Sequence, residues 1–161
     1  MKFIKELIPY VIIVIVVVII RTFLVSPAIV NGDSMIPTLK DNEVVFVNKY
    51  VHYFSEYKRF DMVVVKIENE LLIKRLIAFE GETVEYKDNE LYINDKKIDT
   101  PLDFEYTKDF KDKVEKNSIF VLGDNRNISK DSRYFGSFNL NDVKGTVTLR
   151  VFPFNKIGIV K

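Results

Sequence analysis

An apolar run near the N-terminus constrains this chain more than any other feature of its sequence. Every residue from Val11 to Ile20 is valine or isoleucine, and the run extends from Leu7 to Val25 with Arg21 as its only charge. Its length of about 19 residues is close to the roughly 20 that a helix needs to cross a bilayer. Because a chain in lipid must satisfy its own backbone hydrogen bonds, we predict a transmembrane helix over residues 7–25.

Two other interpretations of this run stay open. β-Branched residues suit strands, so a buried pair of strands is one alternative, although strands are usually 3–10 residues long. A cleaved signal peptide is the other, but no convincing small-x-small site follows the run. Lys2 and Lys5 precede it and favour a cytoplasmic N-terminus. We therefore predict a short cytoplasmic segment (1–6), an uncleaved anchor (7–25) and an extracytoplasmic domain (26–161).

Composition excludes several classes of function. The formal net charge is +1, which gives no electrostatic case for binding nucleic acid. The chain has no cysteine and therefore no disulfide, thiol nucleophile or zinc–thiolate site. His52 is its one histidine, so a His-rich metal site is impossible and a Ser-His-Asp triad would have to use His52. We interpret His52 as a surface or interfacial residue.

After Pro27 the pattern is mainly that of β-strands. Short apolar runs separated by turn residues predict seven strands, over Val44–Val47, Met62–Ile67, Leu71–Phe79, Thr83–Tyr86, Leu91–Ile93, Ser118–Leu122 and Thr146–Val151. The charged segment 99–117 is expected to be a surface excursion. The aromatic residues between Tyr50 and Phe60 fit either core packing or a lipid interface. Residues 26–161 should thus form a mainly β domain large enough for a core of its own.

Ser34 lies in the stretch NGDSMIPTL, between a glycine and a proline. It could simply form a turn, or it could be a nucleophile. A serine nucleophile without a suitable histidine needs another base, and lysine is the base of known Ser-Lys variants. Lysine acts as a base only when neutral, so burial or a nearby cation must lower its pKa from about 10.4.

Lys74 is the lysine whose sequence surroundings could do this. It stands in LLIKRLIAF, whereas most other lysines have polar neighbours. Alternation along a strand places Lys74 and Arg75 on opposite faces of the sheet, so one cation must lie among apolar side chains if both faces are covered. The alternative is an edge strand from which both cations extend into water.

The segment GDNRNISKDSRYFG, residues 123–136, follows the apolar strand SIFVL. It could satisfy its own backbone through Asx turns, or it could form a hydrogen-bonded scaffold. Asp124 and Asp131 could be proposed as metal ligands. Paired with Arg126 and Arg133, they fit ion pairs better, so we expect no metal.

Taken together, the motifs GDSMIPTL (32–39), IKRLIAFEGE (73–82) and GDNRNISKDSRYFG (123–136) resemble those of type I signal peptidases. The resemblance is to the single-anchor form of Gram-positive bacteria, and with the anchor and the closing RVFPF it covers essentially the whole chain. It implies a membrane-anchored serine endopeptidase of the bacterial cell membrane, with a mainly β, antiparallel and barrel-like catalytic domain. It implies no cofactor.

The resemblance also implies roles for individual residues. Ser34 would be the nucleophile, Lys74 the general base and Ser129 the serine that orients this lysine. The same motifs imply that Asp124, Asp131 and Arg133 hold the scaffold and that Met35 lines the site. If the substrate binds as an extended strand, Ile29, Val30 and Ile73 are candidates for the walls of its pockets. The Ser34 N–H would be one oxyanion donor. The expected substrates are signal peptides of translocated preproteins, which would be cut after Ala-x-Ala sites. The enzyme is expected to contact the lipid bilayer and to lie near the secretion translocon.

The sequence departs from the family pattern at several positions. Gly32 replaces a serine that helps to form the oxyanion hole in some members, Ala78 and Glu80 replace a glycine and a proline, and Phe60 stands where glycine is usual. Two alternatives to the enzyme remain open: a catalytically silent, membrane-anchored homologue that binds or regulates, and a related Ser-Lys self-cleaving regulator. The latter carries a DNA-binding domain where this chain has its apolar run.

Overall fold

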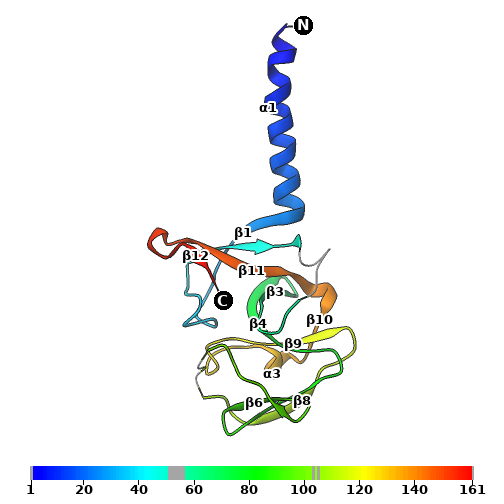
Figure 1. Ribbon diagram of the computed structural model, residues 1–161, viewed down its shortest axis with the longest axis vertical. Helices are drawn as coiled ribbons and strands as arrows, with labels where there is room; N and C mark the ends of the chain where they lie inside the picture. Colours follow the sequence, from blue (N-terminus) through cyan, green and yellow to red (C-terminus); the bar gives the residue numbers. More distant parts are fainter. Residues whose placement is uncertain (1, 51–56, 103, 105, 161) are drawn as a thin grey trace.

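The computed structural model describes residues 2–50, 57–102, 104 and 106–160. His52, Tyr53 and Phe54 lie outside the described residues, so the interpretations given for them stay predictions. Figure 1 shows a long N-terminal helix that projects from a β domain, with the C-terminus close to the end of the domain from which the helix leaves.

The N-terminal helix α1 spans Lys2–Ile19 and continues as a π-helical turn, η1, over Ile20–Leu24. In the part of the chain that the structure describes, no helix combines the length and the apolar character needed to cross a membrane. The transmembrane helix predicted for residues 7–25 is therefore not supported. Its predicted end was also too late, because Val25 already pairs with Asn48 in the sheet.

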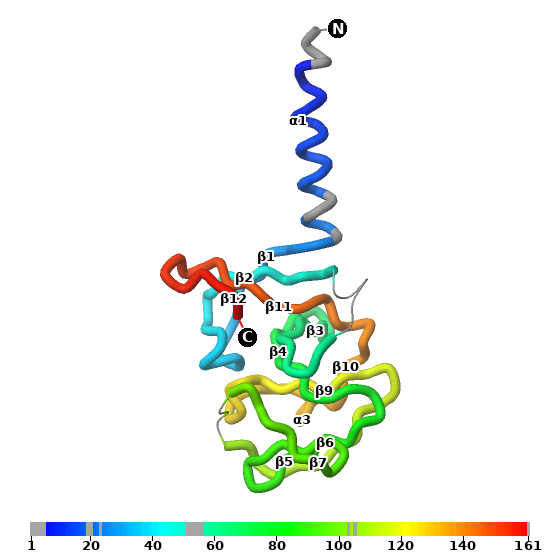
Figure 2. The backbone as a smooth tube through the Cα atoms, in the orientation of Figure 1, coloured from blue at the N-terminus to red at the C-terminus, as the bar shows by residue number. Residues whose placement is uncertain are grey.

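The larger sheet holds eight antiparallel strands among the described residues. Their order is β1-β2-β11-β3-β4-β9-β10, and β12 pairs with β11. The bounds are β1 Val25–Ile29, β2 Val44–Asn48, β3 Met62–Ile67, β4 Glu70–Phe79, β9 Ser118–Leu122, β10 Phe138–Asn139, β11 Val143–Phe152 and β12 Gly158–Ile159. Short helical turns lie between these strands: α3 Ser132–Phe135, η2 Leu140–Asp142 and η3 Phe154–Lys156. The tube in Figure 2 shows β1, β2 and β11 together beneath α1.

A smaller sheet forms the end of the molecule farthest from α1 (Figure 1). Its order within the described residues is β7-β6-β5-β8, with bounds β5 Thr83–Lys87, β6 Glu90–Ile93, β7 Lys96–Lys97 and β8 Phe110–Lys113. Strand β8 corrects the expectation that 99–117 is only a surface excursion. Phe110 turns toward the core while three charged residues follow it, so the segment has no apolar periodicity, yet its backbone pairs with β5.

Strand β4 contributes side chains to the hydrophobic clusters of both sheets. It lies between β3 and β9, and its buried residues pack into more than one hydrophobic cluster. Leu76 packs with the β3 and β9 side chains of the larger sheet, whereas Ile77 and Ala78 pack against the smaller sheet. Ile73 contacts a third cluster, which contains Met35. The prediction of a mainly β, antiparallel fold is confirmed.

Candidate active site

Ser34 lies in the turn that follows β1. Ile36 N–H donates to the carbonyl of Asp33 over 3.2 Å, and Leu39 N–H donates to Met35 O over 2.9 Å. Met35 and Leu39 are buried in the core, which anchors the turn. Gly32 has a φ of 83°, a left-handed conformation that glycine adopts readily. The anchored turn leaves Ser34 half-buried at the surface of the domain.

Lys74 lies in the interior strand β4 and is only 2% exposed. Its Nζ lies 2.7 Å from Ser34 Oγ and 3.1 Å from Ser129 Oγ, both within hydrogen-bond distance. The alternative of an edge strand with both cations in water is wrong, because β3 and β9 flank β4 and Arg75 is buried as well. One strand therefore carries two buried cations on opposite faces.

The surroundings of Lys74 favour its neutral form. Burial lowers the pKa of Lys74 to about 8, because the ammonium loses hydration that the apolar surroundings do not replace. The Asp131 and Asp124 carboxylates raise this pKa and the Arg133 guanidinium lowers it. The net result is an amine of which a substantial fraction is neutral near pH 8 while it contacts a serine hydroxyl.

The loop that contains Ser129 is tied directly to the Ser34 turn. Asn125 N–H donates to Ser34 O over 3.0 Å, and Ser129 N–H donates to Asn125 O over 3.1 Å. Gly123 lies so close that a Cβ there would stand 2.2 Å from Ser129 Oγ and 2.5 Å from Ser34 O. The approach of the two segments thus requires a residue without a side chain at position 123.

Asp131 and Arg133 hold the other end of this loop. The buried Asp131 carboxylate accepts hydrogen bonds from Gly123 N–H at 3.0 Å and from Arg133 N–H at 3.2 Å, which caps α3. The Arg133 side chain pairs with the same carboxylate, from Nε at 2.9 Å and from Nη2 at 2.9 Å. One carboxylate therefore fixes the end of β9 relative to α3.

Asp124 pairs with Arg75, not with Arg126. Both groups are buried, and Arg75 Nε and Nη2 donate to the two carboxylate oxygens over 2.7 and 2.6 Å. The expected Arg126 pair was wrong because Arg126 instead donates to Gly123 O and stacks on Phe104 at 4.1 Å. Arg75 was missed as a site residue, although its place in an apolar strand was a usable signal.

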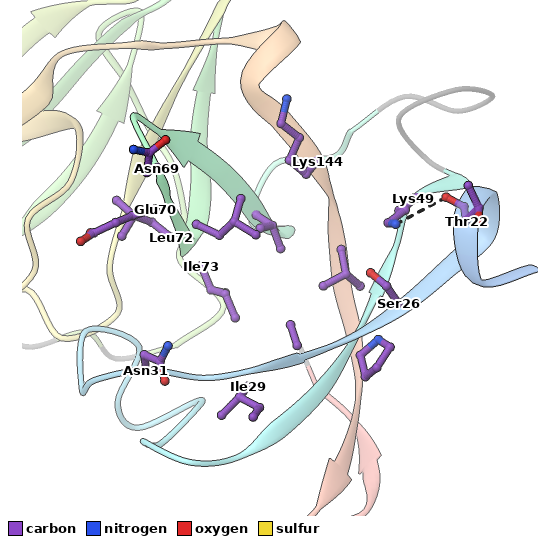
Figure 3. A pocket seen from close by; sticks show the side chains of 15 residues that line it. Thr22, Ser26, Ile29, Asn31, Lys49, Asn69, Glu70, Leu72, Ile73 and Lys144 are labelled. Carbon is purple, nitrogen blue, oxygen red and sulfur yellow. Dashed lines mark hydrogen bonds between the residues drawn. The ribbon is translucent and has the colours of Figure 1, made fainter. Parts of the chain in front are cut away.

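A cleft beside this cluster has a cavity volume of about 1070 Å³. Figure 3 shows Ile29 and Ile73 projecting from opposite walls, formed by β1 and by the first half of β4. Val30 and Met35, which were expected to line a pocket, lie instead in the core behind these walls, 3% and 1% exposed. Within the described residues, no three His, Cys, Asp or Glu side chains form a group that could hold a metal.

A family model described as signal peptidase, peptidase S26, matches residues 3–152. The chain belongs to this signal peptidase family. It is 43% identical over 157 residues to signal peptidase I of Bacillus amyloliquefaciens, covering 89% of this chain and 85% of the relative. It is 42% identical over 161 residues to signal peptidase I S of Bacillus subtilis strain 168, covering 91% and 88%.

A solved signal peptidase I structure supports the same assignment. The crystal structure of the enzyme from Enterococcus faecalis V583 superposes with a TM-score of 0.54 at 35% identity. The match covers 58% of this chain and 98% of that one. The S26 chain is thus a serine peptidase and a hydrolase.

Proposed function

We propose that this peptidase removes N-terminal signal peptides from exported preproteins, with Ser34 as nucleophile and Lys74 as general base. The observation that carries the proposal is the 2.7 Å contact between Ser34 Oγ and the buried Lys74 Nζ. A nucleophile and a base within hydrogen-bond distance, with the base oriented by a third group, is the arrangement that acyl transfer requires. Here Ser129 is the orienting group, 3.1 Å from Nζ.

The mechanism follows from these contacts. Neutral Lys74 takes the hydroxyl proton of Ser34 while Oγ bonds to the scissile carbonyl carbon. The resulting oxyanion accepts a hydrogen bond from the Ser34 N–H. As the C–N bond breaks, Lys74 gives its proton to the departing amine and an ester remains on Ser34. Lys74 then takes a proton from water, which attacks the ester and releases the signal peptide, and the proton returns to Ser34 Oγ.

The cleft supports a substrate that binds as an added strand. β1 is an edge strand, and β4 pairs with β9 only from Arg75 onward, so residues 70–74 pair with β3 alone. An extended peptide between these two walls would gain affinity from main-chain pairing and specificity from side-chain pockets. Because Val30 and Met35 close the core behind Ile29 and Ile73, we expect shallow pockets that suit small residues, as in Ala-x-Ala sites.

We further propose that α1 attaches the enzyme to the bacterial cell membrane, with the β domain on the extracytoplasmic side near the translocon. The support is the exposed apolar surface of the helix, since Val14 is 61% exposed and Val18 56%. Contiguous apolar patches of this kind mark interaction sites for lipid or protein. In a flotation assay with lipid vesicles, the full chain should rise with the vesicles and a Val14→Asp/Val18→Asp variant should stay behind.

The function is tested by incubating the detergent-solubilised chain with an exported preprotein that has an Ala-x-Ala site, and mapping the new N-terminus by mass spectrometry. We expect one cut after the second alanine. Ser34→Ala and Lys74→Ala should each abolish it while their circular dichroism spectra remain that of the parent. Cleavage retained by Lys74→Ala would refute the dyad. If the parent chain cuts no preprotein, the catalytically silent homologue becomes the better interpretation.

A further inference from the structure

Two lysines occupy the end of the cleft that lies farthest from Ser34. Lys49 follows β2 and Lys144 is the second residue of β11, and both line the cleft together with Thr22 and Ser26. Figure 3 shows this end next to the junction of η1 and β1, whereas Ile29, Ile73 and Asn31 lie at the other end. The cleft thus continues well beyond the walls at Ile29 and Ile73.

A β-bulge directs Lys144 toward the cleft. The pairing of β11 with β3 shifts between Val143 and Gly145, so Lys144 is the extra residue on its strand. Bulges of this kind redirect a side chain relative to the regular pleat. Gly145, with a φ of 146° and with Asn48 O only 2.4 Å from where its Cβ would be, permits the irregularity. The position of the lysine is therefore built into the backbone.

Among the residues that the structure describes, neither lysine has an acidic partner. Lys49 Nζ donates to the carbonyl of Thr22 over 3.4 Å, and Lys144 Nζ donates to that of Asn141 over 2.8 Å. Both side chains are half-buried, and no carboxylate among the described residues forms an ion pair with either. Glu70 also lines the cleft, but Figure 3 shows its carboxylate pointing away from the two lysines. Two half-buried cations facing one cleft attract an anionic ligand group.

We propose that Lys49 and Lys144 form a subsite that selects signal peptides with an acidic residue about six to eight positions before the cut. This rests on the proposed function, in which the acyl part of the substrate runs along β1 away from Ser34. Two paired strands rise by about the same distance per residue, so a substrate paired with β1 advances one residue for each residue of β1. Leu24, whose carbonyl accepts the Lys49 N–H, lies five positions before Ile29, which we place beside the first three substrate residues.

The test is a set of peptides that share an Ala-x-Ala site. Each peptide carries one Glu, Gln or Lys, and this residue is placed in turn at each position from the fourth to the tenth before the cut. For the full chain in detergent at low salt, kcat/KM should favour Glu over Gln by roughly twofold to fivefold at the sixth to eighth positions, and Lys should be worst. Salt screens such pairs, and at roughly 0.5 M the Debye length falls to a few Å. The preference for Glu should therefore shrink at this salt concentration.

Charge reversal makes the inference falsifiable. In the Lys49→Gln/Lys144→Gln variant the Glu-to-Lys ratio should fall to about one, and in Lys49→Glu/Lys144→Glu it should invert. A ratio measured within one variant does not depend on the fraction of folded enzyme. Lys113→Gln, an exposed position on β8, should keep the parental ratio.

The outcomes separate the subsite from the function itself. If the parent chain cuts no peptide, the proposed function fails. If it cuts the Glu, Gln and Lys peptides equally at every position, only the subsite fails. If the double variant loses activity equally on all peptides in anionic vesicles but not in detergent, the lysines bind lipid head groups and the subsite is overturned.

Discussion

The backbone N–H of Asn125 donates a hydrogen bond to the carbonyl oxygen of Ser34 over 3.0 Å. This contact joins the turn of the proposed nucleophile to the loop of Ser129, and both segments contact Lys74 from different parts of the sequence. A movement of the loop is therefore transmitted to both partners of Lys74. The site depends on how the two segments fit together as well as on the reactive side chains.

Activity should rise with pH. Since only neutral Lys74 can accept the Ser34 proton, and its pKa is lowered to about 8, kcat/KM should increase about tenfold between pH 7 and 9 and then level off. The measurement is kcat/KM from pH 6 to 10 with a peptide that does not titrate in this range. A profile that is flat, or that falls with pH, would contradict a lysine base.

Gly123→Ala should inactivate the enzyme. The added Cβ would meet Ser129 Oγ at 2.2 Å and Ser34 O at 2.5 Å, so at least one segment must move by about an ångström, which can cost on the order of 100-fold in rate. Peptide cleavage and the thermal midpoint report on activity and on folding. Gly158→Ala is the matched control, because no atom lies within 4 Å of its Cβ position, and it should retain parental activity.

Asp124→Asn should destabilise the fold strongly. It leaves the buried Arg75 guanidinium without its counter-ion, and breaking a buried pair from one side typically costs about 3–5 kcal/mol of unfolding free energy. Urea denaturation gives this value. The exposed pair of Lys97 and Glu90 offers the comparison, since Glu90→Gln should leave the urea midpoint nearly unchanged. Equal effects of the two substitutions would argue against the buried pair.

Phe60→Gly should be more stable than Phe60→Ala by about 1 kcal/mol. Phe60 has a φ of 71°, in the left-handed region that disfavours any residue with a Cβ, and its backbone is fixed there by bonds to Leu76 and Arg75. Both substitutions remove the same ring, so their difference in unfolding free energy isolates the backbone cost. In an extended strand the order would be reversed, because glycine is less stable there than alanine.

The strands whose apolar residues are contiguous could be predicted from the sequence. β3 and β9 have the predicted bounds because both are short, buried runs of β-branched and aromatic residues. β1 could not be predicted, since Val25 is continuous with the apolar run before it and only its pairing with β2 separates the two. β8 was missed because a strand can be held by main-chain pairing while its side chains are mostly charged.

Part of the candidate site could also be predicted from the sequence. Lys74 could be identified because a lysine within an apolar strand is unusual. The partner of a charge cannot be read in this manner, because Arg75 and Asp124 are 49 residues apart and nearer arginines compete in the sequence. Pocket walls are equally hard to predict. Successive residues of a strand point to opposite faces, so the register of β1 determines whether Ile29 or Val30 faces the cleft.

The alternation of faces along a strand has a chemical consequence in β4. Lys74 and Arg75 are neighbours on opposite faces of one strand, so sliding β4 by a single residue would put the guanidinium where the amine now stands. An amine can give up its proton at moderately alkaline pH, whereas a guanidinium stays charged at any pH the protein tolerates. The register with β3 and β9 thus determines which of two adjacent cations faces Ser34, and only one of them can ever act as a base.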